Sequence, residues 1–461
     1  MRRLERKAPA SKVGIVHLGP GAFFRAFGAV YTHEVAQSDW EILAVSLRSP
    51  AVRDALKPQD CAYTSVSLGR EGRSYTQVES IADCLAAPED PLAVLRAMAD
   101  PGVRIVSLTI TEKGYCHSGA SGRLDFEHPD IVHDLSETIP RSAIGYIVRA
   151  LEMRREAGVS PFTVLSCDNL PNNGALVRGL VVEFARALNG DLADWIGSKG
   201  RFPATMVDRI TPAVTPKDVE GVSQEIGARD EACVMHEPFR QWVIEDDFVD
   251  GARPDWDLAG AQFVKDVAPF EVMKLRCLNG THSAIAYLGY LSGYKTVFEA
   301  MSDPRIAAFV EHLWEEIRPT VPTPQGEDLE AYCGSLRERY LNKSIEHKTW
   351  QIAMDGSQKL PQRLVGTLVD TLDAGRDGSG LILSIAAWMV YAGGTDLQGD
   401  PIDVRDPMAE RLKGARVDDF LSIPEIFPAD FANGAVREEI CRAYDALVRV
   451  GPLEAIKGII R

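Results

Sequence analysis

The sequence predicts an α/β domain with a largely parallel sheet, followed by an all-α domain. In the first half of the chain, short apolar runs alternate with longer helical patterns, as expected for βαβ units. From about residue 270 the patterns are nearly all helical. The 461 residues also exceed what one hydrophobic core usually organises, which favours at least two domains.

The strands expected in the first half are buried apolar runs. They cover residues 13–18, 42–47, 104–110 and 162–166, and a further β-like run ends at 206–210. Helical patterns at 24–36 and 141–156 lie between them. Strands that alternate with helices in this way pair mainly in parallel.

The second half begins after a turn-rich stretch at 251–255. Its expected helices cover residues 270–291, 305–317, 364–374, 381–391, 409–413 and 437–450. We therefore expect domains at 1–267 and 268–461. Because small-molecule sites favour clefts between domains, the first helix of the second domain is a candidate for function.

The composition excludes several classes of protein. The chain has 50 basic and 66 acidic residues, a net charge of −16, which argues against nucleic-acid or acidic-membrane partners. No apolar run approaches the length of a membrane span, and no apolar stretch follows the basic N-terminus as in a secretory signal. We expect a cytoplasmic protein.

The cysteines and histidines give no metal-binding pattern. The eight cysteines are scattered without a C-x-x-C pair, which predicts reduced thiols. His117, His128 and His133 lie near one another in a polar stretch that we interpret as a surface loop. We expect no metal.

A glycine turn follows the first strand and precedes a helical pattern. Gly19 and Gly21 match the first two glycines of the dinucleotide fingerprint, whose backbone approaches a pyrophosphate. Phe24 stands where the third glycine is expected. The context favours a Rossmann-like nucleotide-binding domain, although the partial motif alone is weak.

The end of the second strand leaves the cofactor's 2′ position open. NAD-binding proteins usually place a carboxylate there, but this chain has Leu47-Arg48-Ser49-Pro50. Arg48 is either a 2′-phosphate contact or a surface residue.

Polar clusters follow three strands and occupy one later loop. Carboxyl ends of parallel strands are where open α/β sheets bind ligands, although turn chemistry is the alternative for each cluster. The strand-end clusters lie at 109–115, 167–174 and 206–210. In the loop at 350–363, Lys359 and Arg363 could hold a hydroxylated or carboxylated substrate.

The segment at 270–282 carries the most informative combination. On a regular helix, Asn279 lies roughly 140° and His282 about 80° around from Lys274, so all three can face one cleft. A lysine, an amide and an imidazole suit proton transfer at a carbonyl or alcohol. The alternative is a solvated lysine beside a packed histidine.

Together these motifs resemble the polyol-specific long-chain dehydrogenase/reductase family, which includes mannitol 2-dehydrogenase and fructuronate reductase. The resemblance extends from His17-Leu18-Gly19-Pro20-Gly21 to the loop at 355–359. Its most specific element is residues 274–282, which are similar to the family signature K-x(4)-N-x(2)-H. Such a match implies an NAD(P)-dependent oxidoreductase with a Rossmann-like domain and an all-α domain.

The resemblance also implies roles for individual residues. Lys274 is the expected general base, Asn279 and Asn169 hold the substrate oxygen, His282 positions the substrate, and Glu271 belongs to a proton path. The expected substrate contacts are Asp208, Lys359 and Arg363. The expected cofactor contacts are Gly19, Gly21, Phe23, Arg25, Arg48, Thr111 and Glu112.

Two departures bear on the substrate. Phe24 stands where the family usually has a histidine, and Gln351 stands where some mannitol-active members have an arginine. The run at 347–363 is more similar to the fructuronate reductases, which favours D-fructuronate and D-mannonate over mannitol or arabinitol. NAD is the expected cofactor, and NADP is the alternative. We expect a monomer or a small homo-oligomer. The alternative from another class is a nucleotide-sensing protein without turnover.

Overall fold

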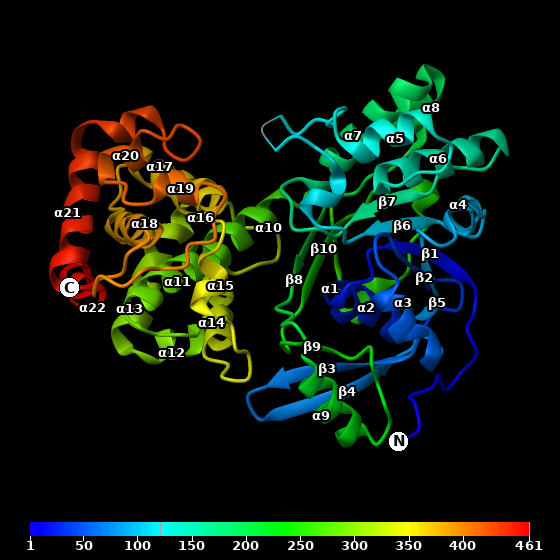
Figure 1. Cartoon of the computed structure of the whole chain (residues 1–461), viewed down its shortest axis with the longest axis horizontal. Coiled ribbons are helices and arrows are strands. Elements are labelled where there is room, and N and C mark those ends of the chain that lie inside the picture. The colour runs from blue at the N-terminus through cyan, green and yellow to red at the C-terminus, as the bar shows by residue number, and fades with distance from the viewer. Residues whose placement is uncertain (120, 461) are drawn as a thin grey trace. The chain divides into compact units, whose positions relative to one another are not determined.

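The computed structural model describes residues 1–119 and 121–460. The chain forms two compact units, unit 1 (Met1–Ala268) and unit 2 (Pro269–Arg461) (Figure 1). Unit 1 contains three sheets with covering helices, and unit 2 is helical. The predicted α/β and all-α classes are therefore confirmed.

The central sheet of unit 1 has five parallel strands in the order β5-β2-β1-β6-β7. Their bounds are β1 (Val13–Leu18), β2 (Glu41–Ser46), β5 (Ile81–Ala86), β6 (Ile105–Leu108) and β7 (Thr163–Ser166). From β1 the chain runs first to β2 on one side and later to β6 on the other. The strand order therefore reverses between β1 and β6, and open α/β sheets bind ligands at such a switch point.

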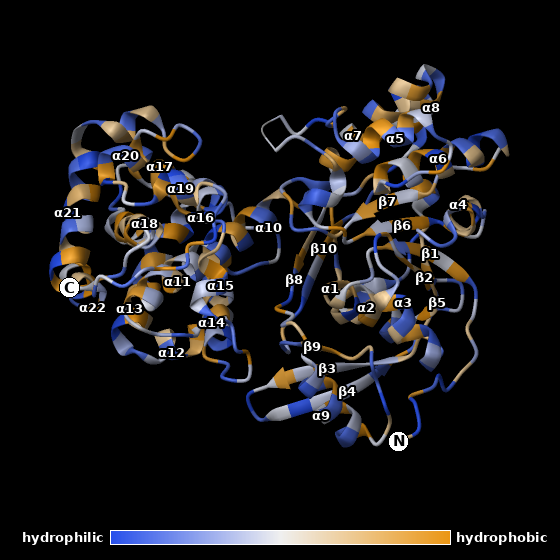
Figure 2. Ribbon diagram, viewed as in Figure 1, coloured by the Kyte–Doolittle hydropathy of each residue, from blue (hydrophilic) through white to orange (hydrophobic). Residues whose placement is uncertain are grey.

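Both faces of this sheet are covered, so its strands are nearly continuous apolar runs, which Figure 2 shows in orange. Val16 and Leu18 join a core with helices on one face. The intervening Ile15 joins a second core on the other face. The first core includes α4 (Pro91–Ala99), α6 (Ala143–Glu156), α7 (Asn173–Leu188) and α8 (Gly190–Lys199). The second includes α1 (Ala22–Ala26), α2 (Gly28–Val35) and parts of the smaller sheets.

The two smaller sheets have three strands each, in the orders β11-β10-β8 and β4-β3-β9. Their bounds are β3 (Tyr63–Gly69), β4 (Gly72–Val78), β8 (Thr205–Asp208), β9 (Val234–His236), β10 (Gln241–Glu245) and β11 (Gln262–Val264). Strand β8 pairs antiparallel with β10. The expectation that Asp208 ends a strand of the parallel sheet is therefore wrong, because its strand belongs to another sheet. The remaining helices of unit 1 are α3 (Ala51–Leu56), α5 (Pro129–Ser136) and α9 (Pro216–Ile226).

The described part of unit 2 has helices and no named strand. Its α-helices are α10 (Ala268–Met273), α11 (Thr281–Leu291), α12 (Val297–Ser302), α13 (Pro304–Ile317), α14 (Leu329–Tyr340), α15 (Thr349–Ala353), α16 (Gly356–Leu360), α17 (Gly366–Asp373), α18 (Ser379–Ala392), α19 (Ala409–Leu412), α20 (Val417–Leu421), α21 (Gly434–Val450) and α22 (Pro452–Ile459). Two π-helical segments, η5 (Lys274–Gly280) and η7 (Pro361–Val365), interrupt them.

Helix α18 forms the centre of unit 2 and is buried from Gly380 to Ala392. The carboxylate of Glu316 accepts the N–H groups of Gly380 at 2.8 Å and Leu381 at 2.9 Å. A carboxylate at this position satisfies helix donors that water cannot reach. Within residues 1–119 and 121–460, no helix is both long and apolar enough to cross a membrane.

Candidate active site

The Gly19-Pro20-Gly21 turn lies directly after β1, at the switch point of the parallel sheet. Gly19 has φ +87°, and a Cβ there would collide with the backbone carbonyl of Thr109 after β6. A Cβ on Gly21 would meet no atom within 4 Å. The turn therefore needs glycine at its first position and leaves open space at its second, which fits a cofactor phosphate approaching the backbone.

Phe24 takes over the packing role of the missing third glycine. Its ring stacks on His17 with centroids 3.3 Å apart and planes within 6°. Gly28 provides the room, because a Cβ there would lie 2.6 Å from the Phe24 ring. His17 also contacts Ser107 at 2.8 Å and Thr109 at 2.9 Å, and burial lowers the pKa of His17 to about 3. A neutral imidazole thus joins β1, the glycine turn and β6.

A pocket of about 280 Å³ adjoins the glycine turn. Gly19, Gly21, Arg48 and Thr111 line it, as expected for cofactor contacts, and Arg141 lines it as well. The other three predicted cofactor residues do not line this pocket: Phe23, Arg25 and Glu112. The buried Arg25 guanidinium instead donates to the carbonyls of Pro20 and Ala232, so it supports the turn from within unit 1. A direct contact between Arg25 and cofactor stays a prediction.

The loops after β6 and β7 are joined by Asp168. Its carboxylate accepts the N–H groups of Ile110 at 2.9 Å and Thr111 at 3.0 Å, and the Tyr115 hydroxyl at 2.7 Å. Thr111 has φ +64° and ψ 161°, a conformation that is costly for a residue with a branched side chain. Asn169, the predicted amide contact, is exposed and comes next in the chain. The geometry makes Asp168 the anchor of both loops.

Replacing Asp168 by asparagine should therefore raise the KM for the cofactor by about 10–100-fold, because a hydrogen bond to a charged group contributes roughly 1.5–3 kcal/mol. The amide keeps the size of the side chain but offers one acceptor oxygen where Ile110 and Thr111 now find two. Initial rates at varied NADH, together with the thermal midpoint, test this. A lowered midpoint with unchanged KM would show that Asp168 only stabilises the fold.

In unit 2, the segment with Lys274, Asn279 and His282 is helical throughout, but η5 interrupts it. In a π-helix each N–H reaches the carbonyl five residues back, so the advance of about 100° per residue does not apply. The predicted angles of 140° and 80° around the helix are therefore wrong, although the three residues share one continuous helix. Lys274 and His282 are buried, and Asn279 is half-buried.

Side chains from α13 and α14 support the wide turn of η5. The indole of Trp314 donates to the Cys277 carbonyl at 3.0 Å, and the hydroxyl of Tyr340 donates to the Leu278 carbonyl at 3.0 Å. A Cβ on Gly280 would lie 3.0 Å from the Arg363 carbonyl oxygen, so η5 and η7 approach closely there. Carbonyls displaced from regular helix geometry thus have buried partners, and the segment that carries Lys274 is rigidly held.

His282 lies in a cluster that its own motif does not reveal. Its ring is 4.5 Å from that of His347 in a T-shaped contact and 5.5 Å from that of Tyr340. Burial, and then the charges of His347 and Arg363, hold the pKa of His282 well below its usual range. Burial lowers the pKa of His347 to about 4. Among the described residues, the buried His282 Nε2 and His347 Nδ1 have no hydrogen-bond partner, so each neutral ring keeps one unused polar atom.

Lys359 and Arg363 are brought to the same cluster. The Arg363 guanidinium donates to the Ser283 hydroxyl at 3.2 Å, one residue after His282. The Lys359 ammonium donates to the Met354 carbonyl at 2.6 Å, and its charge contributes to lowering the pKa of His282 and His347. Burial lowers the pKa of both Lys359 and Arg363. Two cations, Lys359 and Arg363, together with the neutral rings of His282 and His347 form what we term the cationic cluster of unit 2.

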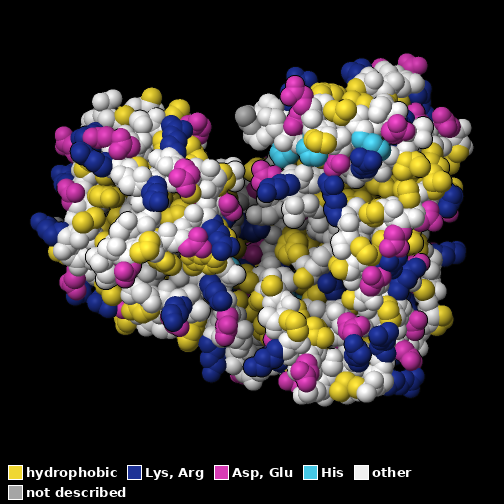
Figure 3. All heavy atoms as spheres, in the orientation of Figure 1, with side chains coloured by type: hydrophobic (Ala, Val, Ile, Leu, Met, Phe, Trp, Pro, Cys, Tyr) yellow, Lys and Arg dark blue, Asp and Glu magenta, His cyan; other side chains and the backbone are white. Residues whose placement is uncertain are grey.

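Two of the three histidines that we interpreted as part of a surface loop belong to helix α5 instead. His128 is the N-cap of α5, with Nδ1 accepting the Asp130 N–H at 3.2 Å, and His133 lies within α5. Figure 3 shows histidine side chains in cyan at the surface of this part of unit 1. Across the described residues, two groups place possible ligand atoms within 4.8 Å of one another: Cys116, His128 and Asp130, and His312, Glu316 and Asp377. Hydrogen bonds within the protein already engage Asp130 and Glu316.

The pattern of both units matches one protein family. A family model described as the mannitol dehydrogenase Rossmann domain matches residues 13–258, and one described as the mannitol dehydrogenase C-terminal domain matches residues 266–448. The chain belongs to the mannitol dehydrogenase family. The resemblance noted from the signature at 274–282 is thereby confirmed.

Relatives in the mannitol dehydrogenase family match the chain over nearly its whole length. The D-mannonate oxidoreductase of Escherichia coli is 47% identical, with 96% of this chain and 95% of the relative covered. A mannitol 2-dehydrogenase of Aspergillus terreus is 40% identical, with 98% and 94% covered. The Pseudomonas fluorescens mannitol 2-dehydrogenase, solved as a ternary complex with NAD and D-mannitol, is 36% identical with a TM-score of 0.86 and 99% of each chain covered.

Membership of the mannitol dehydrogenase family makes the chain an oxidoreductase that acts on CH–OH groups with a nicotinamide cofactor. Sequence reasoning included His17 and His347 only as members of longer runs and gave neither a role, because spacing alone does not distinguish them. His347 is recognised as a site residue only from its contact with His282, which is 65 residues earlier in the sequence. Of the remaining predicted residues, Glu271 lies in α10 and Asp208 is buried at the end of β8.

Proposed function

We propose that the chain is an NAD-dependent oxidoreductase that interconverts D-fructuronate and D-mannonate. The identity to the Escherichia coli D-mannonate oxidoreductase supports this substrate, because the match covers both domains. The observation that carries the proposal is the environment of Arg363 in the cationic cluster.

Arg363 is a half-buried cation without a carboxylate partner among the described residues. Its electrostatic neighbours that raise its pKa are the phenols of Tyr287 and Tyr340, and its side chain donates to the Ser283 hydroxyl. Removing a charge even partly from water without a counter-charge costs free energy. A substrate carboxylate would supply that counter-charge and match the guanidinium with two parallel hydrogen bonds. A neutral polyol carries no charge and could not supply this counter-charge.

The rest of the cationic cluster supports an anionic, hydroxylated substrate. Lys359 adds a second half-buried cation, although the carboxylates of Asp355 and Asp406 lie near enough to raise its pKa. The neutral rings of His282 and His347 each have one nitrogen without a partner, which can donate or accept one hydrogen bond. These groups suit a sugar acid, which offers one carboxylate and several hydroxyls.

The proposed proton chemistry assigns Lys274 as the base that takes the hydroxyl proton during oxidation and returns it during reduction. A lysine needs a lowered pKa for this work, since the unperturbed value is about 10.4. The amides of Asn279 and Asn169 are proposed to donate to the substrate oxygen, where negative charge develops. Glu271 is proposed to pass the proton toward solvent. When bound, the nicotinamide accepts or supplies the hydride.

The glycine turn and its pocket fit the dinucleotide. A Cβ at Gly19 would fill space next to Thr109, while Gly21 faces open space beside the pocket. Gly19, Gly21, Arg48 and Thr111 are the residues proposed to hold the cofactor from unit 1. Asp208 is proposed to contact a substrate hydroxyl.

Initial rates with NADH on D-fructuronate and D-fructose, compared in parallel, test the substrate. We expect a clear preference for D-fructuronate in kcat/KM. In the Arg363→Gln variant this preference should shrink by about 10–150-fold, the value of roughly 1.5–3 kcal/mol for a charge-assisted hydrogen bond. The rate on D-fructose should change little, because that sugar has no carboxylate.

Arg376→Gln is the matched control, because Arg376 is an exposed arginine of the same unit. It should leave the preference unchanged. Faster turnover of D-fructose than of D-fructuronate by the unsubstituted enzyme would contradict the proposal and place the chain with the mannitol 2-dehydrogenases.

A further inference from the structure

Arg48 marks the edge of the nucleotide pocket at which cofactor preference is decided. It follows β2 and lines the pocket together with Gly19 and Gly21. In sheets of this type, an acidic residue near the end of the second strand holds the ribose hydroxyls of NAD, and an arginine accommodates the 2′-phosphate of NADP. Residues 47–50 include Arg48 but no acidic residue, so the local sequence alone would favour NADP.

A carboxylate reaches Arg48 from elsewhere in the fold. Asp130, in the first turn of α5, accepts a hydrogen bond from Arg48 Nη2 at 2.7 Å. The Asp130 side chain is 15% exposed and that of Arg48 is 66% exposed, so the carboxylate is the better fixed partner.

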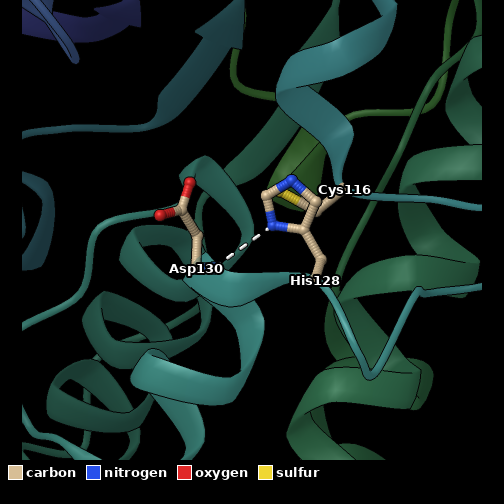
Figure 4. A group of neighbouring side chains, drawn as sticks. All are labelled: Cys116, His128 and Asp130. Carbon is tan, nitrogen blue, oxygen red and sulfur yellow. Dashed lines mark hydrogen bonds between the residues drawn. The ribbon is translucent and has the colours of Figure 1, made fainter.

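The first turn of α5 holds Asp130 in place. Its backbone N–H donates to His128 Nδ1 at 3.2 Å, and Figure 4 shows this bond with the thiol of Cys116 behind the histidine ring. Thus Asp130 and Arg48 are 82 residues apart in sequence and adjacent in space.

We propose that Asp130 is the residue that makes this enzyme prefer NAD over NADP. The proposal rests on the nicotinamide-dependent function proposed above. Asp130 already pairs with Arg48, so a second anion must compete with this carboxylate for the guanidinium. A 2′-phosphate carries close to two negative charges at pH 7, and beside Arg48 it meets a carboxylate of the same sign. A ribose hydroxyl meets no such repulsion and can donate to a carboxylate.

The same carboxylate belongs to the group of Cys116, His128 and Asp130 whose ligand atoms lie within 4.8 Å of one another, which raises the alternative of a cation site. The charge of Arg48 beside the Asp130 oxygen opposes a divalent cation, and His128 Nδ1 is already engaged as a helix cap. The contacts therefore favour selection of the cofactor.

The test is the binding of NADH and NADPH to the purified protein, followed by the fluorescence of the reduced nicotinamide. This readout does not require turnover. The unsubstituted protein should bind NADH more tightly, and Asp130→Asn should shift the ratio of the two dissociation constants toward NADPH by about tenfold or more, because removing the carboxylate frees Arg48 to pair with the 2′-phosphate. The double variant Arg48→Gln, Asp130→Asn should lose that gain, since the freed arginine provides it.

Glu127→Gln is the matched control. It removes one negative charge from an exposed side chain three residues before Asp130, and the ratio should stay unchanged. An unchanged ratio in Asp130→Asn would overturn the proposal. So would a zinc-dependent rise in the thermal midpoint that Asp130→Asn abolishes, because a bound cation there would attract the 2′-phosphate. Failure of the proposed substrate would appear separately, as normal NADH binding without turnover of D-fructuronate.

Discussion

Replacing Lys274 by alanine should lower kcat by about 10²–10⁴-fold, the usual contribution of a positioned general acid or base. Lys274 is buried at the start of η5, where Trp314 and Tyr340 hold the backbone carbonyls that follow it. The variant removes the proposed proton acceptor and leaves those supports in place. Steady-state rates on D-fructuronate with NADH measure the loss.

Two measurements make this result specific to proton transfer. Binding of NADH should stay within a few-fold of the unsubstituted value, because the glycine turn lies in unit 1. Lys343→Ala, which truncates an exposed lysine of unit 2, should keep normal turnover. If Lys274→Ala retained near-normal kcat, Lys274 would not be the base.

Replacing Gly19 by alanine should raise the dissociation constant for NADH by about 10–100-fold. Gly19 has φ +87°, and the added Cβ would collide with the Thr109 carbonyl. Backbone strain of this kind costs roughly 1–3 kcal/mol, and its relief must move the turn that lines the pocket. Fluorescence titration with NADH measures the change.

Gly158→Ala separates this effect from general strain. Gly158 also has a left-handed φ, +69°, but a Cβ there meets no atom within 4 Å, and the residue lies beyond the end of α6. We expect this control to lower the thermal midpoint slightly and to leave the affinity for NADH unchanged. Equal affinities in the two alanine variants would show that the turn does not hold the cofactor.

The parts of the fold that sequence predicts best are those dictated by local pattern. Residues 13–18 form a mostly apolar run before glycines, and β1 has those bounds because β2 and β6 pair with its two edges while one core covers each face. By contrast, β5, at one edge of the parallel sheet, has Asp83 among its apolar residues. Its pairing with β2 decides its conformation. The hairpin of β3 and β4 is mostly polar on β4, so it carries little apolar signal.

The candidate site shows the same division. Lys274, Asn279 and His282 can be selected from their spacing in one segment, since the motif is local. The π-helical geometry of η5 cannot be predicted from the local sequence, because side chains on α13 and α14 stabilise it. The roles of His347 and Asp130 cannot be predicted either. They depend on contacts with His282 and Arg48, which only the tertiary fold brings near.

The π-helical segment η5 also limits how this part of the chain can change in length. Adding or removing one residue between Lys274 and Gly280 would rotate every later side chain of α11 about the helix axis relative to Lys274. His282 would leave the ring of His347, and Ser283 would leave the guanidinium of Arg363. Substitutions at intervening positions preserve this phase, whereas insertions and deletions destroy it. The site therefore depends on the number of residues between Lys274 and His282 more than on the identity of most of those residues.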